Sequence, residues 1–367
     1  MAGTWKLIYT NLKTGTVLGE LPAQSFSFTE TLNADGGFQV TMPLVTTTPS
    51  GRLTNDVSAL QVTSADLSPG QNGIYFDRDG TLMGGGILWG VAASVANNSL
   101  TLSGSGFLSY FRHRTIKVDT THSAVDQLDI ARSFVDVAQA VGGGDIGIQT
   151  SETHTSGVTR DRTYLGYERR VVAEVLEQLS QVNNGFDFRF SSSYVAGDIT
   201  VEFITSFPSS GRRTAFVFEL GTNVQLLDFR SNGTTLTNHV DAIGGGDGDD
   251  LPIQTAQDPT GMATRPLLES VLSLSDVTVE ATLLEHAKRA ITRGSEPMLQ
   301  LEVLVFPDQR PVLGSYIVGD LVKVRGSYGY IDLEDAWFRI TSINVSVADD
   351  GAEESKLSLM PLGVFND

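Results

Sequence analysis

The sequence of 367 residues has no cysteine and only five histidines. Without cysteine the chain can form neither a disulfide bond nor a thiolate metal site. The histidines also lack metal-ligand spacing, because none belongs to a His-Glu-x-x-His pattern; they are His113, His122, His154, His239 and His286. Phosphate loops, dinucleotide fingerprints and serine-nucleophile elbows are absent as well. We therefore expect no metal, no cofactor and no enzymatic activity.

Long apolar runs and positive charge are scarce too. No window approaches the ~18 uninterrupted apolar residues of a membrane span, and residues 1–6 lack the apolar region of a secretory signal. We expect no membrane insertion. The formal net charge is -18, whereas a nucleic-acid-binding protein needs a basic surface. This charge argues against sequence-specific nucleic-acid binding and against an anionic membrane surface.

The residues that replace charge are those of strands and turns. Charged residues make up 19% of the chain, below the usual ~25%, and Thr, Ser and Gly are abundant. Asp79-Gly80 and Asn97-Asn98 lie between apolar runs and predict hairpin turns. From Thr4 to about Phe111 we expect an antiparallel barrel or sandwich, with strands at 5–10, 25–28, 38–42, 87–89 and 100–102.

Helical periodicity begins near Thr121. Ser123 is a candidate N-cap for a helix that reaches Gln139. A second helix is expected over 167–182, with Gly185 as its left-handed cap. Strands at 186–190 and 199–204 complete a small α+β unit over roughly 120–206. Beyond Thr214 we expect strands again, at 299–306, 320–324, 337–347 and 355–359, and one helix at 279–292.

Two acidic groups are candidate sites. The loop with Asp247, Asp249 and Asp250 fails the calcium-loop pattern, because its sixth position is a proline and its twelfth is not glutamate. We interpret the loop as a solvated turn. The pair Asp77 and Asp79 has the residue types of a glycosidase, but a hairpin turn and a strand end explain them. No catalytic residue is therefore assigned.

Two basic clusters stand out in this acidic chain. They contain Arg112 and Arg114, and Arg160 and Arg162. One interpretation is a solvated rim with internal ion pairs, worth ~0–1 kcal/mol each. The other is contact with a neighbouring subunit, for which these four arginines are the candidates.

The two ends of the chain show similar patterns. Residues 56–62, 87–91, 94–95 and 99–103 form a series of strand, long hairpin, Ser-Val pair, turn and closing Leu-x-Leu strand. Residues 318–324, 338–343, 346–347 and 356–360 repeat this series. Period-2 patterning alone would make many hairpins look alike. We nevertheless predict two copies of one barrel in the chain.

Several stretches together resemble the tail-hub family of non-contractile tailed phages, whose members are often called minor tail proteins. These stretches are Phe28-Thr29-Glu30-Thr31-Leu32-Asn33, Asp77-Arg78-Asp79-Gly80 with the glycines before Trp89, residues 100–116, Arg162-Thr163-Tyr164, Phe186-Asp187-Phe188-Arg189-Phe190, and residues 319–322 with Phe338-Arg339-Ile340. Each is a short strand or turn pattern, and the resemblance follows their order along most of the chain.

The resemblance implies a mainly β fold with an α+β insertion, in which two related antiparallel β-barrels are decorated by a small α+β domain. The implied domains are a first barrel at 1–115, an α+β domain at 116–206, the first part of a second barrel at 207–309 and its closing strands at 310–367. No lytic domain is expected after them.

The resemblance also implies a role. The chain would be a structural hub at the tip of a phage tail, made in the host cytoplasm and carried in the virion. A homotrimeric ring would close or extend the tail tube, hold a fibre or spike and let DNA pass. The implied partners are itself, the tail tube or distal tail protein, the fibre or spike protein and the tape measure protein. We expect the channel of the ring to be acidic, with Asp247, Asp249 and Asp250 as lumen candidates.

Two other functions remain open. A peripheral baseplate or distal-tail protein that binds host-surface carbohydrate would need exposed aromatic residues in a groove; Trp5, Trp89 and Trp337 lie in strand patterns. A cell-wall hydrolase would need the catalytic pattern that the motif search did not find.

Overall fold

The structure is a computed structural model that describes residues 3–44, 66–182, 184–246, 251–274, 277, 280–307 and 309–361. The acidic residues Asp247, Asp249 and Asp250 and the predicted repeat segment 56–62 lie outside these residues. The chain forms two compact units. The larger consists mainly of residues 1–226 and 303–359, and the smaller mainly of residues 227–302.

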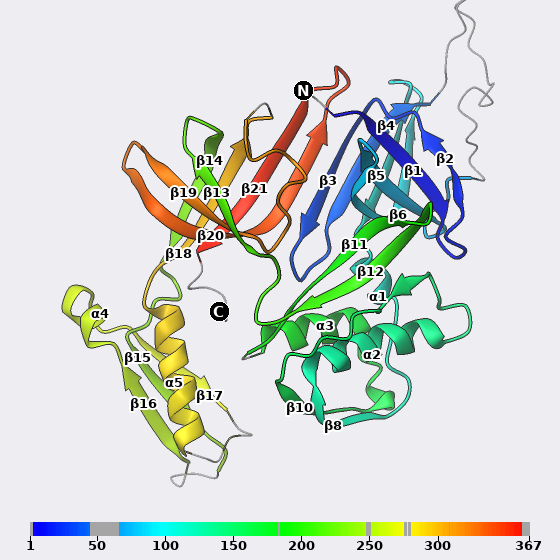
Figure 1. The fold of residues 1–367 in the computed structure, drawn as a ribbon. Coiled ribbons are helices and arrows are strands. Elements are labelled where there is room, and N and C mark those ends of the chain that lie inside the picture. Colours follow the sequence, from blue (N-terminus) through cyan, green and yellow to red (C-terminus); the bar gives the residue numbers. More distant parts are fainter. Residues whose placement is uncertain are drawn as a thin grey trace, which may run out of the picture. The chain divides into compact units, whose positions relative to one another are not determined.

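The fold is mainly β, and its principal feature is a sheet of 13 strands (Figure 1). The strands before the first helix are β1 Trp5–Asn11, β2 Val17–Leu21, β3 Ser25–Thr31, β4 Gly37–Pro43, β5 Asn72–Arg78, β6 Thr81–Ser94 and β7 Ser99–Ser105. The remaining strands of this sheet are β13 Arg213–Glu219, β14 Val224–Asn232, β18 Met298–Val305, β19 Leu321–Tyr328, β20 Ile331–Val347 and β21 Glu353–Pro361.

Alternation of side chains explains these strands. In β4, Phe38, Val40 and Met42 are buried while Gln39 between them is exposed, so one face packs on the core. The predicted hairpins at Asp79-Gly80 and Asn97-Asn98 are confirmed. Asp79 and Gly80 have φ values of 54° and 84°, the left-handed geometry of a two-residue hairpin turn.

The strand order repeats along the chain. Five neighbouring strands lie in the order β3-β4-β7-β6-β5, and another five lie in the order β14-β18-β21-β20-β19. In both sets the chain forms the first and second strands of this order, then the fifth, and then returns through the fourth to the third. We call these sets the first and second repeat. They are joined where β20 pairs antiparallel with β3, and Figure 1 shows these two strands side by side.

The match between the repeats has limits. β1 pairs antiparallel with β5, whereas its counterpart β13 pairs parallel with β19. The predicted segment 56–62 is not described, and β5 is the strand that corresponds to β19. The strand order of the described residues contains no closed barrel.

Between the repeats lies an α/β module, defined as α1 through β12. Its elements are α1 Leu108–Phe111, β8 Thr120–Asp126, α2 Gln127–Ala140, β9 Ile148–Gln149, β10 Thr159–Tyr164, the 3-10 turn Gly166–Glu168, α3 Val172–Gln181, β11 Asp187–Val195 and β12 Asp198–Ser206. The predicted apolar face of α2 is buried, including Leu128, Phe134 and Val135. It packs in one core with Val175 and Leu176 of α3.

Both helix starts in this module were predicted too early. Ser123 is not the N-cap, because residues 120–126 pair with β10 as a strand, and Asp126 caps α2 instead. The second helix begins at Val172, after Arg169 takes a left-handed φ of 51°. Gly185 is not its left-handed cap either. Asn184 has the positive φ, and a side chain on Gly185 would meet the carbonyl of Ser180.

The smaller unit holds a three-stranded sheet in the order β16-β15-β17, with one helix packed on it. Its elements are β15 His239–Ile243, β16 Ile253–Gln257, α4 Pro259–Thr264, β17 Glu269–Ser273 and α5 Glu280–Gly294. Leu283 and Ala287 of α5 are fully buried against Val240 and Ala242, so the predicted helix at 279–292 is confirmed. Within the residues described, no helix has the length and apolar character to cross a membrane.

Candidate functional site

A buried ion pair lies where three parts of the larger unit meet. Arg339 of β20 is only 2% exposed, and its guanidinium pairs with the carboxylate of Asp187 at the start of β11. It also donates to the carbonyl oxygens of Ser210 at 3.1 Å and Gly319 at 3.3 Å. A buried guanidinium is costly unless several acceptors surround it, and here three groups accept from it.

The carboxylate of Asp187 extends this network to the first repeat. One oxygen accepts from the Asn33 side-chain amide at 2.6 Å, and the other accepts from the Ser210 backbone at 2.7 Å. Asn33 lies in the turn between β3 and β4 and also accepts from the Phe188 backbone at 2.6 Å. We call Asn33, Asp187, Ser210 and Arg339 the buried junction. It ties the first repeat, the α/β module and the second repeat together.

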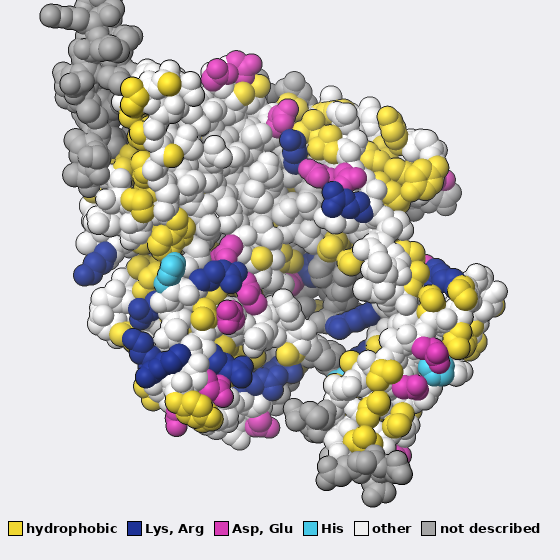
Figure 2. Space-filling model, turned by 180° about the vertical axis from the view of Figure 1, so that it is seen from behind, with side chains coloured by type: hydrophobic (Ala, Val, Ile, Leu, Met, Phe, Trp, Pro, Cys, Tyr) yellow, Lys and Arg dark blue, Asp and Glu magenta, His cyan; other side chains and the backbone are white. Residues whose placement is uncertain are grey.

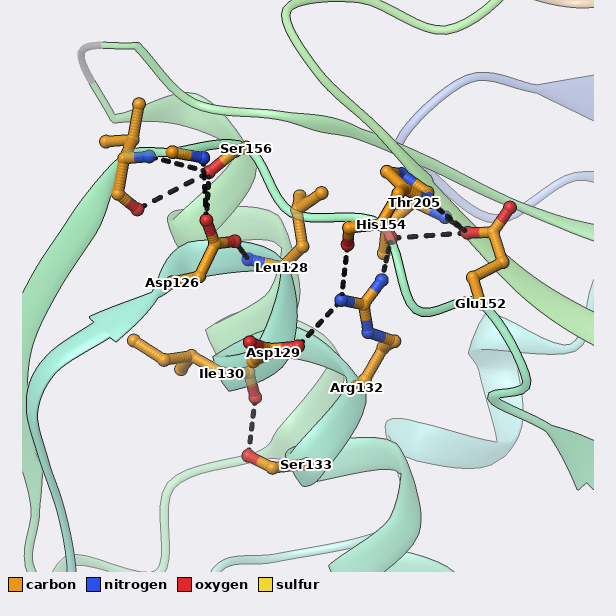
Figure 3. Close-up of polar contacts among 12 residues, drawn as sticks. Asp126, Leu128, Asp129, Ile130, Arg132, Ser133, Glu152, His154, Ser156 and Thr205 are labelled. Atoms are coloured by element: carbon orange, nitrogen blue, oxygen red, sulfur yellow. Dashed lines mark hydrogen bonds and ion pairs between the residues drawn. The ribbon is translucent and has the colours of Figure 1, made fainter.

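A second polar network fixes a loop to the start of α2 (Figure 3). Asp126 accepts from the backbones of Leu128 at 2.9 Å and Gly157 at 2.8 Å, and from the Ser156 hydroxyl at 3.0 Å. Burial alone would raise the pKa of Asp126, but these hydrogen bonds outweigh it and hold the pKa below its ordinary value. The ionised carboxylate therefore serves as helix cap and loop anchor.

The same helix supplies Arg132, whose guanidinium contacts the loop at His154, closer to its beginning than Ser156 and Gly157 (Figure 3). It pairs with Asp129 at 2.7 Å and donates to the His154 carbonyl at 2.8 Å and the Thr205 hydroxyl at 3.1 Å. Glu152 accepts from the backbone of Thr205 at 2.8 Å. This group has residue types found in active sites, but its hydrogen bonds hold the segment 152–157 against α2 and β12.

Glu30 borders a small pocket between β3, β6 and β11. Arg189 and Phe190 from β11 and Gly85 from β6 also line it. Desolvation raises the pKa of Glu30 to about 7, and the charge of Arg189 opposes that rise. The carboxyl is thus poised to change charge near neutral pH.

The carboxylate pair considered for catalysis has structural roles. Asp77 is 4% exposed; it accepts from the Gly80 backbone at 2.8 Å and from the Tyr194 hydroxyl at 2.6 Å. Asp79 accepts from the Thr4 backbone at 2.9 Å. The predicted turn is therefore present. Tyr194 belongs to the hairpin of β11 and β12, so this contact joins that hairpin to the β5–β6 turn.

The four candidate arginines lie around the α/β module, where Figure 2 shows a concentration of Lys and Arg side chains. Arg112 bridges Asp35 and Glu177. Arg114 donates to the carbonyl of Ala138 at 2.8 Å.

The other two are Arg160 and Arg162. Arg160 donates to the Gln127 side chain at 2.8 Å, and Arg162 donates to the Asp161 carbonyl at 3.1 Å. Burial and the nearby charge of Arg162 lower the pKa of Arg160. No group of acidic and histidine side chains in the described ranges could hold a metal ion.

The sequence interpretation missed the buried junction as a unit. Its signal was present, because Asp187 and Arg339 each interrupt an apolar strand sequence, Gly185-Phe186-Asp187-Phe188 and Trp337-Phe338-Arg339-Ile340. Charged residues are rarely buried without a partner. Their separation along the chain hid the pairing.

The fold is similar to solved structures of phage tail proteins. The 43 kDa tail protein of prophage MuSo2 from Shewanella oneidensis matches with a TM-score of 0.65 and 14% identity, over 99% of this chain and 100% of that one. A tail protein from Neisseria meningitidis MC58 matches with 0.63 and 14%, over 99% and 98%. Prophage tail protein gp18 from Listeria monocytogenes EGD-e matches with 0.58 and 11%, over 97% and 94%.

No protein-family model matches this chain, and no curated protein matches it. The similarity therefore rests on three-dimensional structure, where it extends over nearly the full length of both chains. The chain has the fold of phage tail proteins, which confirms at the level of the fold the resemblance inferred from its sequence motifs.

Proposed function

We propose that this chain is a structural hub at the tip of a bacteriophage tail. The observation that carries the proposal is the repeated strand order within one chain. Three chains with two repeats each would form a ring with six similar modules. Such a homotrimer can seat on a hexameric tail tube, anchor a fibre or spike and let DNA pass.

Several parts of the proposal belong together. The two repeats, each completed into a barrel, would account for the domains at 1–115 and at 207–309 with 310–367, and the α/β module for 116–206. The proposed partners are other copies of the chain, the tail tube or distal tail protein, the fibre or spike protein and the tape measure protein. Arg112, Arg114, Arg160 and Arg162 are proposed subunit contacts, and Asp247, Asp249 and Asp250 are proposed lumen residues.

The ring is proposed to pass DNA without binding it. Basic lumen residues would hold phosphates and slow transit, whereas acidic residues repel DNA over a Debye length of ~8–10 Å. The net charge of -18 is consistent with an acidic channel. The proposed role requires no catalysis, and the hydrogen bonds of Asp77 and Asp79 give both carboxylates a structural purpose.

Immunogold labelling of purified virions tests the location. The proposal expects label at the distal end of the tail in every particle. Label along the tube or on the capsid would contradict it. In parallel, the purified chain should not degrade peptidoglycan, and measurable turnover would contradict the non-enzymatic role.

A second candidate is a peripheral tail protein that binds host-surface carbohydrate. Tyr328 and Tyr330 favour it, because they are 72% and 86% exposed at the tip of the β19–β20 hairpin. Aromatic faces are suited to sugar rings, yet two side chains on a hairpin tip do not form a groove. Loss of host-cell binding in Tyr328→Ala, with assembly unchanged, would favour this candidate.

A further inference from the structure

The two repeats are joined by the strand pair β20–β3. Among the described residues, the equivalent segment of β6 in the first repeat has no such partner strand. In the second repeat, residues 331–339 of β20 pair with β19, and residues 342–347 continue alongside β3. In the first repeat, residues 81–87 of β6 pair with β5. Residues 90–94 continue beyond β5, and no strand among the described residues pairs with them on that side.

Burial shows the same difference between the repeats. Ile343, Val345 and Val347 of β20 are 5%, 0% and 8% exposed beneath β3. On the corresponding stretch of β6, Val91 is 38% exposed, and Val95 just beyond the strand is 85% exposed. Apolar side chains thus occupy the equivalent stretches of β6 and β20, but a neighbouring strand, β3, buries only those of β20.

The register of the sheet places Val91 on the core face. A single row of paired residues crosses five strands, from Val347 through Phe26, Val40 and Leu102 to Val91. The first four are at most 8% exposed. The row ends at Val91, on an edge that no described strand pairs with beyond β5, where the backbone can accept another strand.

The strand that should cover this edge also follows from the repeat. β3 occupies the position beside β20, and its counterpart in the second repeat is β14. Within the chain β3 has a strand on both sides, whereas β14 ends the path of the sheet, and among the described residues its one neighbouring strand is β18. Val224 at the start of β14 also bridges Leu220. Val224 and Leu226 alternate with Gln225 and Leu227 there, as Phe26 and Phe28 alternate with Ser25 and Ser27 in β3.

We propose that residues 91–94 of β6 pair antiparallel with residues 225–228 of β14 in a second copy of this chain, with Ala92 opposite Leu227. The contact reproduces between copies the β20–β3 pairing that joins the repeats within one chain. Because two different edges meet, the contact is head-to-tail and can close into a ring. This inference rests on the proposed ring and specifies the interface that builds it.

The absence of cysteine makes the interface directly testable by disulfide trapping. Ala92 lies on the opposite sheet face from Val91, and Leu227 is 42% exposed on β14. Ala92→Cys and Leu227→Cys variants, oxidised separately and after co-expression, should give a covalent dimer only when combined. A variant that carries both cysteines in one chain should give covalent species larger than a dimer. If the two strands pair two residues out of this register, Gln225→Cys should cross-link to Ala92→Cys in place of Leu227→Cys.

Two controls separate this contact from random collision. Leu18 is 44% exposed on β2, at the end of the sheet path opposite β14. Leu18→Cys combined with Ala92→Cys should not cross-link efficiently. Val91→Lys should raise the dissociation constant of the assembly at least about tenfold, since it buries an unpaired charge. Val118→Lys, at a 72% exposed position of the α/β module, should leave assembly unchanged.

The outcomes distinguish the interface from the proposed function. If the chain assembles, but neither β14 cysteine cross-links to Ala92→Cys and Val91→Lys assembles normally, the interface is wrong while the ring proposal stands. If Ala92→Cys alone forms the dimer, the contact is symmetric and the head-to-tail pairing is wrong. If the unmodified chain is monomeric both in solution and in purified tails, the interface and the ring both fail.

Discussion

Arg339 shows at the scale of one residue how this chain uses buried charge. Its guanidinium is enclosed by Asp187 and two backbone carbonyls, so removing it leaves the Asp187 carboxylate without its cation. We expect Arg339→Met to lower the free energy of unfolding by about 3–5 kcal/mol. The exposed pair of Lys6 and Glu20 provides a control, since Lys6→Met should cost about 0–1 kcal/mol.

Urea unfolding of both variants measures this difference. An added Asp187→Leu substitution should restore part of the loss in Arg339→Met, because it removes the stranded carboxylate. Equal effects of Arg339→Met and Lys6→Met would show that the buried junction does not stabilise the fold.

Glu30 makes stability depend on pH. Its pKa rises from 4.5 to about 7 in the folded protein, so the folded state holds the proton more tightly than the unfolded state. The stabilisation that comes from this tighter proton binding is fully present below about pH 4.5, and it is lost as the pH rises through about 7. We expect Glu30→Gln to be more stable than the unmodified chain at pH 8, by about 1–3 kcal/mol.

Chemical unfolding at pH 4.5 and pH 8 tests this sign. The advantage of Glu30→Gln should shrink at the lower pH, where the carboxyl is protonated in the folded state and about half protonated in the unfolded state. A variant that is less stable at pH 8 would mean that the charge of Arg189 outweighs the desolvation of Glu30.

Among the elements, α2 depends on its N-cap residue. Asp126 caps the helix and also anchors Ser156 and Gly157, so Asp126→Ala should cost about 1–2 kcal/mol or more. Because the folded pKa lies below the ordinary 3.8, this stabilisation is present above about pH 4 and is lost as pH falls further. Asp136→Ala is the matched control, since Asp136 lies on the exposed side of the same helix and accepts one bond from Thr150.

Thermal unfolding followed by circular dichroism compares the two variants. Helix loss at lower temperature in Asp126→Ala than in Asp136→Ala is the expected result. The reverse order would contradict the capping role of Asp126.

Period-2 alternation and turn residues predicted most strands of the larger unit. The Phe38-Gln39-Val40 alternation and the Asp79-Gly80 turn are local signals, and the structure contains both. Helix starts were less accurate, because Ser123 and Asp126 are both acceptable caps and only the pairing of residues 120–126 with β10 decides between them. The buried junction depends on contacts between Asn33, Asp187 and Arg339, which no local pattern encodes.

The repeat was predictable for a related reason. Its closing Leu-x-Leu strands, with Leu100 and Leu102 in one copy and Leu357 and Leu359 in the other, are visible in the sequence. The smaller unit interrupts the second repeat between β14 and β18, at the position of the tight β3–β4 turn. That insertion separates β14 from the rest of its repeat and conceals the correspondence.

For the whole molecule, we propose that copies of this chain build a closed ring at a phage tail tip. The chain contains two repeats with the same strand order, and its fold is that of phage tail proteins. A ring of three chains would present six similar modules to a hexameric tube. The stoichiometry of the assembly is therefore the property that separates a hub ring from a peripheral tail protein.

Native mass spectrometry of the assembly, released from purified tails and also formed by the isolated chain, tests this claim most directly. A homotrimeric ring should appear as a species of three chains in both preparations. The proposed interface also predicts that Val91→Lys shifts the isolated chain towards monomer. A monomer in both preparations, or six copies in the assembly released from the tail, would contradict the homotrimeric ring.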